Sequence, residues 1–182
     1  MFKKLNILDE KDKMLRTICD EVKEPLNEKE INLIKRGLKQ LRFSQIEKLS
    51  EKYCLRPGMG LAFPQLGIPK RVIMICHEEE EGVFKDYVLI NPKIISNSEE
   101  IIAAEAGEGC LSVNREVEGH VPRFARITIM GEDLDGNIVK IRAREELSIA
   151  FQHEVDHLDG ILFYDRIDPN KKFYQEGEIR LI

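Results

Sequence analysis

Two histidines four residues apart are the first feature of this sequence that could do chemistry. In FQHEVDHLDG, residues 151–160, His153 and His157 are one helical turn apart and would project from the same helix face. Two imidazoles at that spacing can hold one metal ion, and Glu154 beside the first can act as a general base. Solvated surface helices also carry this short pattern. The stretch alone leaves a catalytic metal site, a structural one and a charged helix all open.

A catalytic metal site needs a third protein ligand and an open position. No H-x-x-G-x-x-H pattern follows His157, but EAGEGCLSV, residues 105–113, places Cys110 in a polar, glycine-rich context. Gly107 and Gly109 flank Glu108, which should let this backbone approach another element closely. The remaining cysteines lie among apolar neighbours or in a helical region and are expected to be small buried hydrophobes: Cys19, Cys54 and Cys76.

A third stretch, GMGLAFPQLGIP at residues 58–69, predicts a rigid loop of close approach before a strand. It contains Gln65. Local patterns do not decide whether this amide belongs to the surface or to a site.

Helical and strand patterns surround these stretches. Residues 27–53 predict an amphipathic helical region with a capping box at Asn27 and Glu30 and a break near Phe43. Strands are expected at 71–76, 87–95, 125–133 and 137–142, with an Asp-Gly turn in 133–137 and a solvated hairpin loop in the acidic HEEEEGVFKD. A last helix should run from about Arg144 to Leu158 and end at Gly160. The order indicates an α+β fold: short antiparallel strands packed around a C-terminal metal-binding helix, with an N-terminal helical segment.

Composition limits the class of protein. The 182 residues suit a single domain, 1–182, of which 42 % are hydrophobic and 34 % charged, with a net charge of −5. We expect no direct sequence-specific nucleic-acid binding, because the charges are mixed and no basic field is present. We expect no membrane association, because no apolar run approaches the ~18 residues of a membrane span. The charged N-terminus and the scattered cysteines favour a cytoplasmic location.

Taken together, three motifs resemble one family. G-x-G-L-A-x-P-Q, E-G-C-L-S and Q-H-E-x-D-H-L-x-G occur in that order, and the chain resembles the peptide deformylases, most closely their longer bacterial class. The resemblance extends roughly from Leu15 to Asp165. The chain departs from it at Phe63, where the family usually has alanine, and near Asp12, where a proline commonly precedes the Leu-Arg pair.

The resemblance implies an enzyme that hydrolyses the N-formyl group from formylmethionine of nascent polypeptides, which it would meet at the ribosome. It implies one divalent ion, Fe²⁺ in the cell with Zn, Ni or Co able to replace it. The expected ligands are Cys110, His153 and His157. Glu154 would take a proton from water and pass it to the leaving amine, while the Gln65 side chain and the Leu111 N–H stabilise the oxyanion.

The resemblance also assigns residues to the substrate. Met59, Ile149 and Ala150 would wall the methionine pocket, although Ile149 could equally be core. The backbone of Gly60 would pair with an extended peptide. Glu108 and Arg123 match a pair that braces the second motif, and Asp156 is expected to support the helix.

Two alternatives stay open. One is another HExxH-type metallopeptidase or amidohydrolase; the other is a non-enzymatic module with a structural Cys-His-His site. The tail NKKFYQEGEIRLI could be a terminal strand, a frayed end or a ribosome contact.

Overall fold

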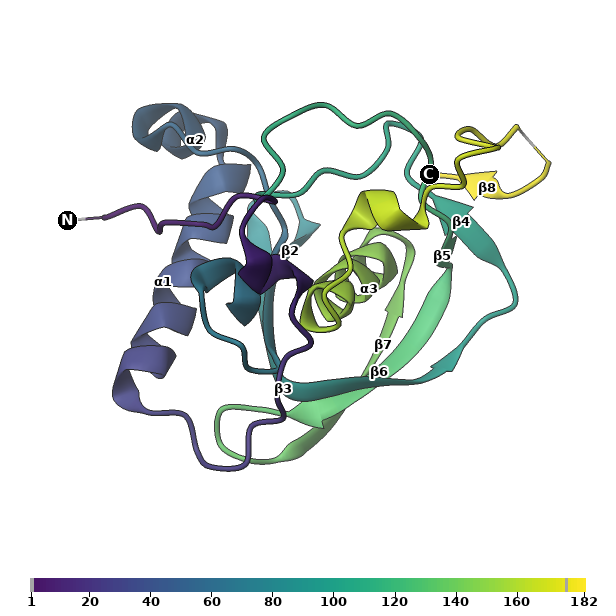
Figure 1. Cartoon of the computed structure of the whole chain (residues 1–182). Helices are drawn as coiled ribbons and strands as arrows, with labels where there is room; N and C mark the ends of the chain where they lie inside the picture. The colour runs from purple at the N-terminus through teal and green to yellow at the C-terminus, as the bar shows by residue number, and fades with distance from the viewer. Residues whose placement is uncertain (1, 176) are drawn as a thin grey trace.

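An antiparallel five-stranded sheet forms the body of the protein. The computed structural model describes residues 2–175 and 177–182. Neighbouring strands follow the order β1-β2-β3-β6-β7, and every pair is antiparallel. Figure 1 shows this sheet curving around the helix α3 (Glu145–Leu158). The strands are β1 (Gly60–Ala62), β2 (Val72–Glu80), β3 (Val83–Asn97), β6 (Arg126–Glu132) and β7 (Ile138–Arg144). The expected α+β architecture is confirmed.

A small second sheet lies beside the N-terminal half of α3, close to the C-terminus of the chain (Figure 1). Its order is β5-β4-β8, made of β4 (Ile101–Ala103), β5 (Arg123–Phe124) and β8 (Arg180–Leu181). β8 pairs with β4 in parallel, and Arg180 forms ion pairs with Glu100 and Glu145. Of the possibilities left open for the tail, its last residues therefore form a terminal strand; residue 176 lies outside the described residues.

Two helices precede the sheet in the sequence. α1 (Glu28–Gln45) begins with the predicted capping box, in which the Asn27 side chain accepts from the Glu30 N–H and the Glu30 carboxylate accepts from the Asn27 N–H. The break falls at Ile46, just beyond the expected position, and α2 (Glu47–Tyr53) follows. Ile34 and Leu41 of α1 are buried with residues of β2, so α1 covers the face of the sheet opposite α3.

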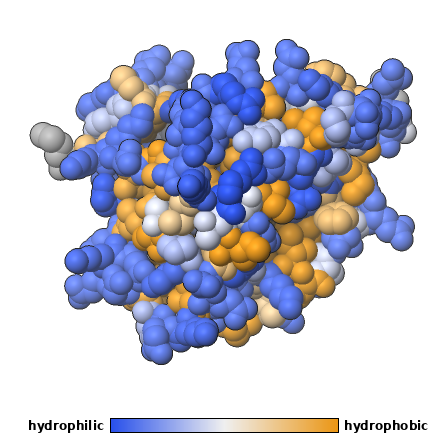
Figure 2. All heavy atoms as spheres, in the orientation of Figure 1, coloured by the Kyte–Doolittle hydropathy of each residue, from blue (hydrophilic) through white to orange (hydrophobic). Residues whose placement is uncertain are grey.

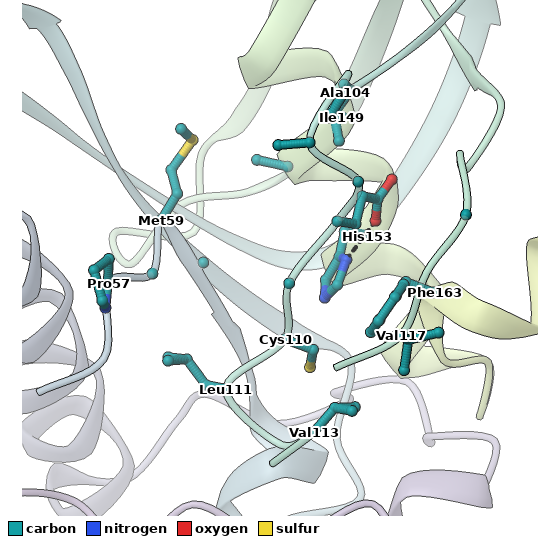
Figure 3. Close-up of a pocket in the computed structure, with 18 of the residues that line it drawn as sticks. Pro57, Met59, Ala104, Cys110, Leu111, Val113, Val117, Ile149, His153 and Phe163 are labelled. Atoms are coloured by element: carbon teal, nitrogen blue, oxygen red, sulfur yellow. Dashed lines mark hydrogen bonds and ion pairs between the residues drawn. The ribbon is translucent and has the colours of Figure 1, made fainter. Parts of the chain in front are cut away.

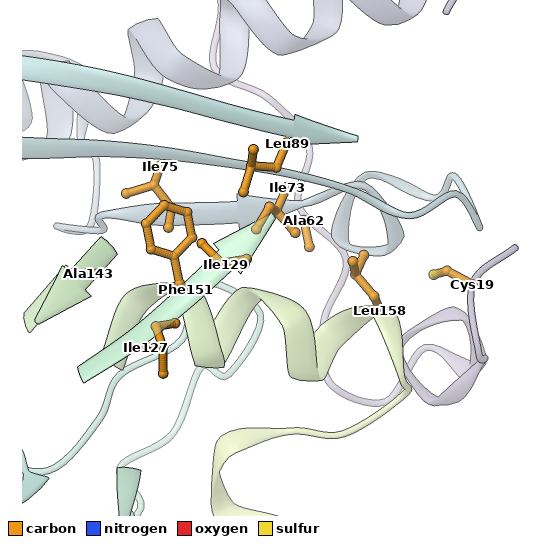
Figure 4. Packing of buried hydrophobic residues seen from close by; sticks show 10 residues of the cluster. All are labelled: Cys19, Ala62, Ile73, Ile75, Leu89, Ile127, Ile129, Ala143, Phe151 and Leu158. Carbon is orange, nitrogen blue, oxygen red and sulfur yellow. The ribbon is translucent and has the colours of Figure 1, made fainter. Parts of the chain in front are cut away.

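The main core lies between α3 and the sheet. Phe151 and Leu158 are fully buried and pack with Ile73, Ile75 and Ile129 (Figure 4). The helix ends as predicted: Gly160 follows with φ of +71°, and an added Cβ would lie 2.8 Å from the carbonyl of Arg16. Only glycine suits this position. The core fixes the rotation of α3 and so decides which of its polar residues face away from the sheet.

Two local expectations were wrong. The acidic stretch 77–86 is not a loop: β2 continues to Glu80 and β3 resumes at Val83. Its acidic side chains are solvated on a projecting ribbon, and the turn needs only Glu81 and Gly82, whose φ is +76°. Cys54 is exposed, because it ends α2 in a left-handed conformation beyond the core. Cys19 and Cys76 are buried as expected.

Within the described residues, none of the helices combines the length and the apolar character that crossing a membrane requires.

Candidate metal centre and active site

Three potential metal ligands from two segments converge beside α3. The ligand atoms of Cys110, His153 and His157 all lie within 4.8 Å of one another. The two histidines occupy successive turns of α3, and Cys110 lies in the loop between β4 and β5, with its Sγ 3.3 Å from His157 Nε2. One thiolate and two imidazoles on a largely buried site are ligands that divalent transition metals accept, so the residues present fit a metal ion.

Glu108 fixes the orientation of the first histidine. Nδ1 of His153 lies 2.8 Å from Glu108 Oε2, which leaves His153 Nε2 for the cluster (Figure 3). Such a carboxylate behind a histidine sets its tautomer and strengthens it as a ligand. Burial, followed by the charges of His153 and Arg123, lowers the pKa of His157 well below its usual range. This keeps His157 in the neutral form that can bind metal.

A buried ionic network holds the cluster from behind. Arg123 donates to Glu108 at 2.7 and 3.0 Å and to Asp156 at 2.6 Å. Asp156 also accepts from Arg166. Burial alone would raise the pKa of Glu108, but His153 and Arg123 lower it to about 2, so Glu108 stays ionised. Through Glu108, Arg123 and Asp156 the network joins the loop of Cys110 to α3.

Glu154 is buried beside the cluster and lines a pocket that Cys110 and His153 also line. Its Oε2 has no hydrogen-bond partner among the described residues. Burial raises the pKa of Glu154 to about 7. A carboxyl group with a pKa near neutrality can both accept and release a proton under ordinary conditions.

Gln65 lies beside Cys110, and Leu111 follows Cys110 in the same loop; both line the pocket. Gln65 Oε1 accepts from the Ala62 N–H at 2.8 Å, and Nε2 donates to Ser112 Oγ at 3.1 Å and to Cys110 Sγ at 3.6 Å. The carbonyl end of the amide is therefore held by the backbone, and the N–H₂ end faces the cluster. Gln65 is 1 % exposed, which rules out a surface amide.

One pocket of about 1050 Å³ is lined by Cys110, His153 and Glu154. Met59, Ile149 and Ala150 line it together with His153, as Figure 3 shows for Met59 and Ile149. Phe63 instead packs in the core that faces α1, so its departure from the family pattern leaves the pocket wall unchanged. On the face shown in Figure 2, apolar residues gather between clusters of charged side chains.

Sequence reasoning missed several residues of the pocket. Phe163 stacks on the His153 ring, with centroids 6.1 Å apart, and Ala104, Val113, Val117 and Ile182 add apolar surface. The apolar run after Gly160 was a weak signal for Phe163. Gly107 approaches the Gly119 carbonyl as expected, whereas a Cβ on Gly109 would meet nothing within 4 Å.

Comparison with known proteins places the chain in a family. A family model described as "Polypeptide deformylase" matches residues 4–173. The chain is 47 % identical over 171 residues to a "Peptide deformylase" of Shouchella clausii, covering 92 % of this chain and 93 % of that protein. It is 44 % identical over 168 residues to "Peptide deformylase 2" of Bacillus anthracis, covering 92 % and 91 %. A solved structure of peptide deformylase from Thermotoga maritima superimposes with a TM-score of 0.71 at 30 % identity, covering 92 % and 99 %. The Cys-His-His cluster has the ligands for a metal-ion site, and the chain belongs to the polypeptide deformylase family.

Proposed function

We propose that this chain removes the N-formyl group from the formylmethionine of nascent polypeptides in the pocket around Cys110, His153 and His157. The observation that carries the proposal is the position of Glu154: a buried carboxyl group with a pKa near 7 beside three converging metal ligands. A structural metal site has no use for such a group. The enzyme would be a metallohydrolase, because it would use water and a metal ion to split a linear amide.

Cys110, His153 and His157 would hold one divalent ion. When bound, the ion supplies a Lewis acid that polarises the formyl carbonyl and lowers the pKa of water. The neutral His157 and the carboxylate-backed His153 suit this role. As the family resemblance implies, we propose Fe²⁺ as the ion in the cell, with Zn, Ni or Co able to replace it.

Glu154 would move the proton. Its carboxylate accepts a proton from the attacking water and then donates it to the departing amine, so that one residue serves as base and as acid. The raised pKa supports both steps, because the proton is neither lost too readily nor held too tightly.

Gln65 and Leu111 would stabilise the charge that develops on the formyl oxygen. The Gln65 N–H₂ faces the cluster because Ala62 N–H holds the opposite end of the amide. The Leu111 N–H makes no hydrogen bond to any described residue and is free to donate. Donors fixed before the reaction need no reorganisation when charge develops.

The substrate would lie along β1. β1 is the first strand of its sheet, so one edge of Gly60 is unpaired and can bind an extended peptide backbone. Met59, Ile149 and Ala150 supply apolar surface for the methionine side chain. We further propose that residues 1–182 act as one catalytic domain in the reducing cytoplasm, close to the ribosome.

The test compares three substrates with protein purified anaerobically and analysed for metal. Formyl-Met-Ala-Ser should be cleaved far faster than its acetyl analogue, and an internal peptide bond should not be cleaved. Equal rates on the formyl and acetyl peptides would overturn the proposal in favour of a broader amidohydrolase. Cleavage of the internal bond would favour a metallopeptidase.

A further inference from the structure

Arg56 contacts the loop that carries Cys110 and Leu111. This arginine lies between α2 and β1 and has no assigned role. Its Nη1 donates to the Val113 carbonyl at 2.8 Å, and its Nη2 donates to the Cys110 carbonyl at 3.3 Å and to the Leu111 carbonyl. We propose that Arg56 is a positioning residue for deformylation, which fixes the direction of the Leu111 N–H. The inference rests on the proposed function.

Peptide geometry connects the arginine to that N–H. The Cys110 carbonyl and the Leu111 N–H belong to one peptide unit, and the structure contains no cis peptide bond in its described part. In a trans peptide these two groups point in opposite directions. Holding the carbonyl from one side therefore directs the N–H to the other side, away from Arg56. An oxyanion donor needs such a fixed direction before the reaction.

The remaining contacts of the loop provide only part of this restraint. The Val113 N–H closes a turn onto the Cys110 carbonyl at 3.1 Å, and the Glu10 N–H binds the Ser112 carbonyl at 2.8 Å. The Leu111 and Val113 carbonyls receive their described hydrogen bonds from Arg56. Without Arg56, the Cys110 carbonyl would keep only the Val113 N–H, and the peptide unit after Leu111 would lose its described restraint.

The neighbouring wall of the pocket is tied to the same point. A Cβ on Gly58 would lie 2.9 Å from the Leu111 side chain, so the segment before β1 packs directly on this loop. Arg56 precedes Gly58 by two residues. It thus joins the segment that leads to Met59 and Gly60 to the loop that supplies a ligand and a donor.

An arginine suits this position because three backbone carbonyls accept hydrogen bonds from it. A planar guanidinium offers several N–H groups in a fixed fork, whereas a lysine ammonium is a flexible point charge. Lysine at position 56 should therefore retain only part of the restraint. Because Arg56 is an exposed residue, its removal should affect the rate more than the folding.

The test compares R56M, R56Q and R56K with R42M, loaded with metal. Arg42 forms an exposed ion pair with Asp86 and does not line the pocket. R56M should lower kcat on formyl-Met-Ala-Ser by about tenfold or more, but by less than the ~10²–10³-fold typical of a deleted oxyanion donor. KM should change little, R56K should recover part of kcat, and R42M should match the unmodified enzyme.

Metal content and the thiolate-to-cobalt absorption of Co²⁺-loaded protein give a readout that is independent of activity. Both should be unchanged in R56M, since Cys110 stays a ligand. Loss of metal or of this absorption would overturn the inference, as would a kcat equal to that of R42M. If R56M does not fold, R56K and R56Q decide by the same criteria. An inactive unmodified enzyme would refute the proposed function instead, so the two failures are distinguishable.

Discussion

Gly60 and Glu154 lie in direct contact, with no room for a side chain between them. A Cβ added to Gly60 would lie 2.3 Å from Glu154 Oε1 and 2.7 Å from its Cδ and Cγ. Glycine here is set by sterics, because the backbone of β1 must pass the carboxylate.

Replacing Gly60 with alanine should therefore displace the Glu154 carboxylate. We expect kcat on formyl-Met-Ala-Ser to fall by about 10²-fold, the typical effect of misplacing a reacting group by 1 Å. The matched variant is Gly109→Ala, whose new Cβ meets no atom within 4 Å and should cost at most a few-fold. Equal kcat values for the two variants would show that the contact does not position Glu154.

Changing Glu154 to glutamine should abolish proton transfer and leave the metal in place. The amide keeps the size of the side chain but cannot accept the proton, so a loss of about 10²–10⁴-fold in kcat is expected. Metal analysis should still find one ion per chain, because the three ligands are unchanged. Loss of the ion from this variant would assign Glu154 to metal binding instead.

Changing Gln65 to glutamate tests the oxyanion donor with almost no change in shape. The group facing Ser112 and Cys110 would then accept hydrogen bonds instead of donating them. We expect kcat to fall by about 10²–10³-fold with the protein still folded. Ser112→Ala is the control, since it only loosens the amide and should lose much less. Activity of Gln65→Glu within tenfold of the unmodified enzyme would exclude Gln65 as a donor.

Parts of the fold and of the site could be predicted because their signals are local. The capping box of Asn27 and Glu30 and the helical spacing of His153 and His157 depend on residues within one turn, where propensity and geometry act directly. Predicting Cys110 as a ligand required the family resemblance, because the two histidines lie in a helix more than forty residues further along the chain.

The contacts of Arg56 and Phe163 could not be predicted for a physical reason. Arg56 binds backbone carbonyls, which every residue carries, so no side-chain pattern marks its partners. Phe163 meets His153 only because the chain reverses after Gly160. The exposure of Cys54 likewise depends on where α2 ends relative to the core.

Removing Arg123 should strongly destabilise the fold. Its guanidinium is 2 % exposed and pairs with Glu108 and Asp156, which are 4 % and 7 % exposed. Arg123→Met would leave two buried carboxylates without this partner, which should lower the free energy of unfolding by about 3–5 kcal/mol. Arg126→Met, which breaks an exposed pair with Glu100, should cost about 0–1 kcal/mol. Urea unfolding of both metal-loaded variants measures the difference, and similar losses would contradict the role of burial.

The ion pair of Glu30 and Lys70 should make stability depend on pH. Lys70 Nζ lies 2.5 Å from Glu30 Oε1. Burial raises the pKa of Glu30, but Lys70 and the Asn27 N–H together lower it by more. The resulting pKa is below the ordinary value of 4.5. A lowered carboxyl pKa stabilises the folded state at pH values above that ordinary value, and the contribution is lost as the pH falls through the folded pKa.

Glu30→Gln keeps the capping box and removes the charge. The variant should therefore be less stable than the unmodified protein by up to about 1 kcal/mol at neutral pH, and the gap should close below pH 4.5. Urea unfolding at several pH values measures this gap; a gap that is constant with pH would mean that the charge of Glu30 does not contribute.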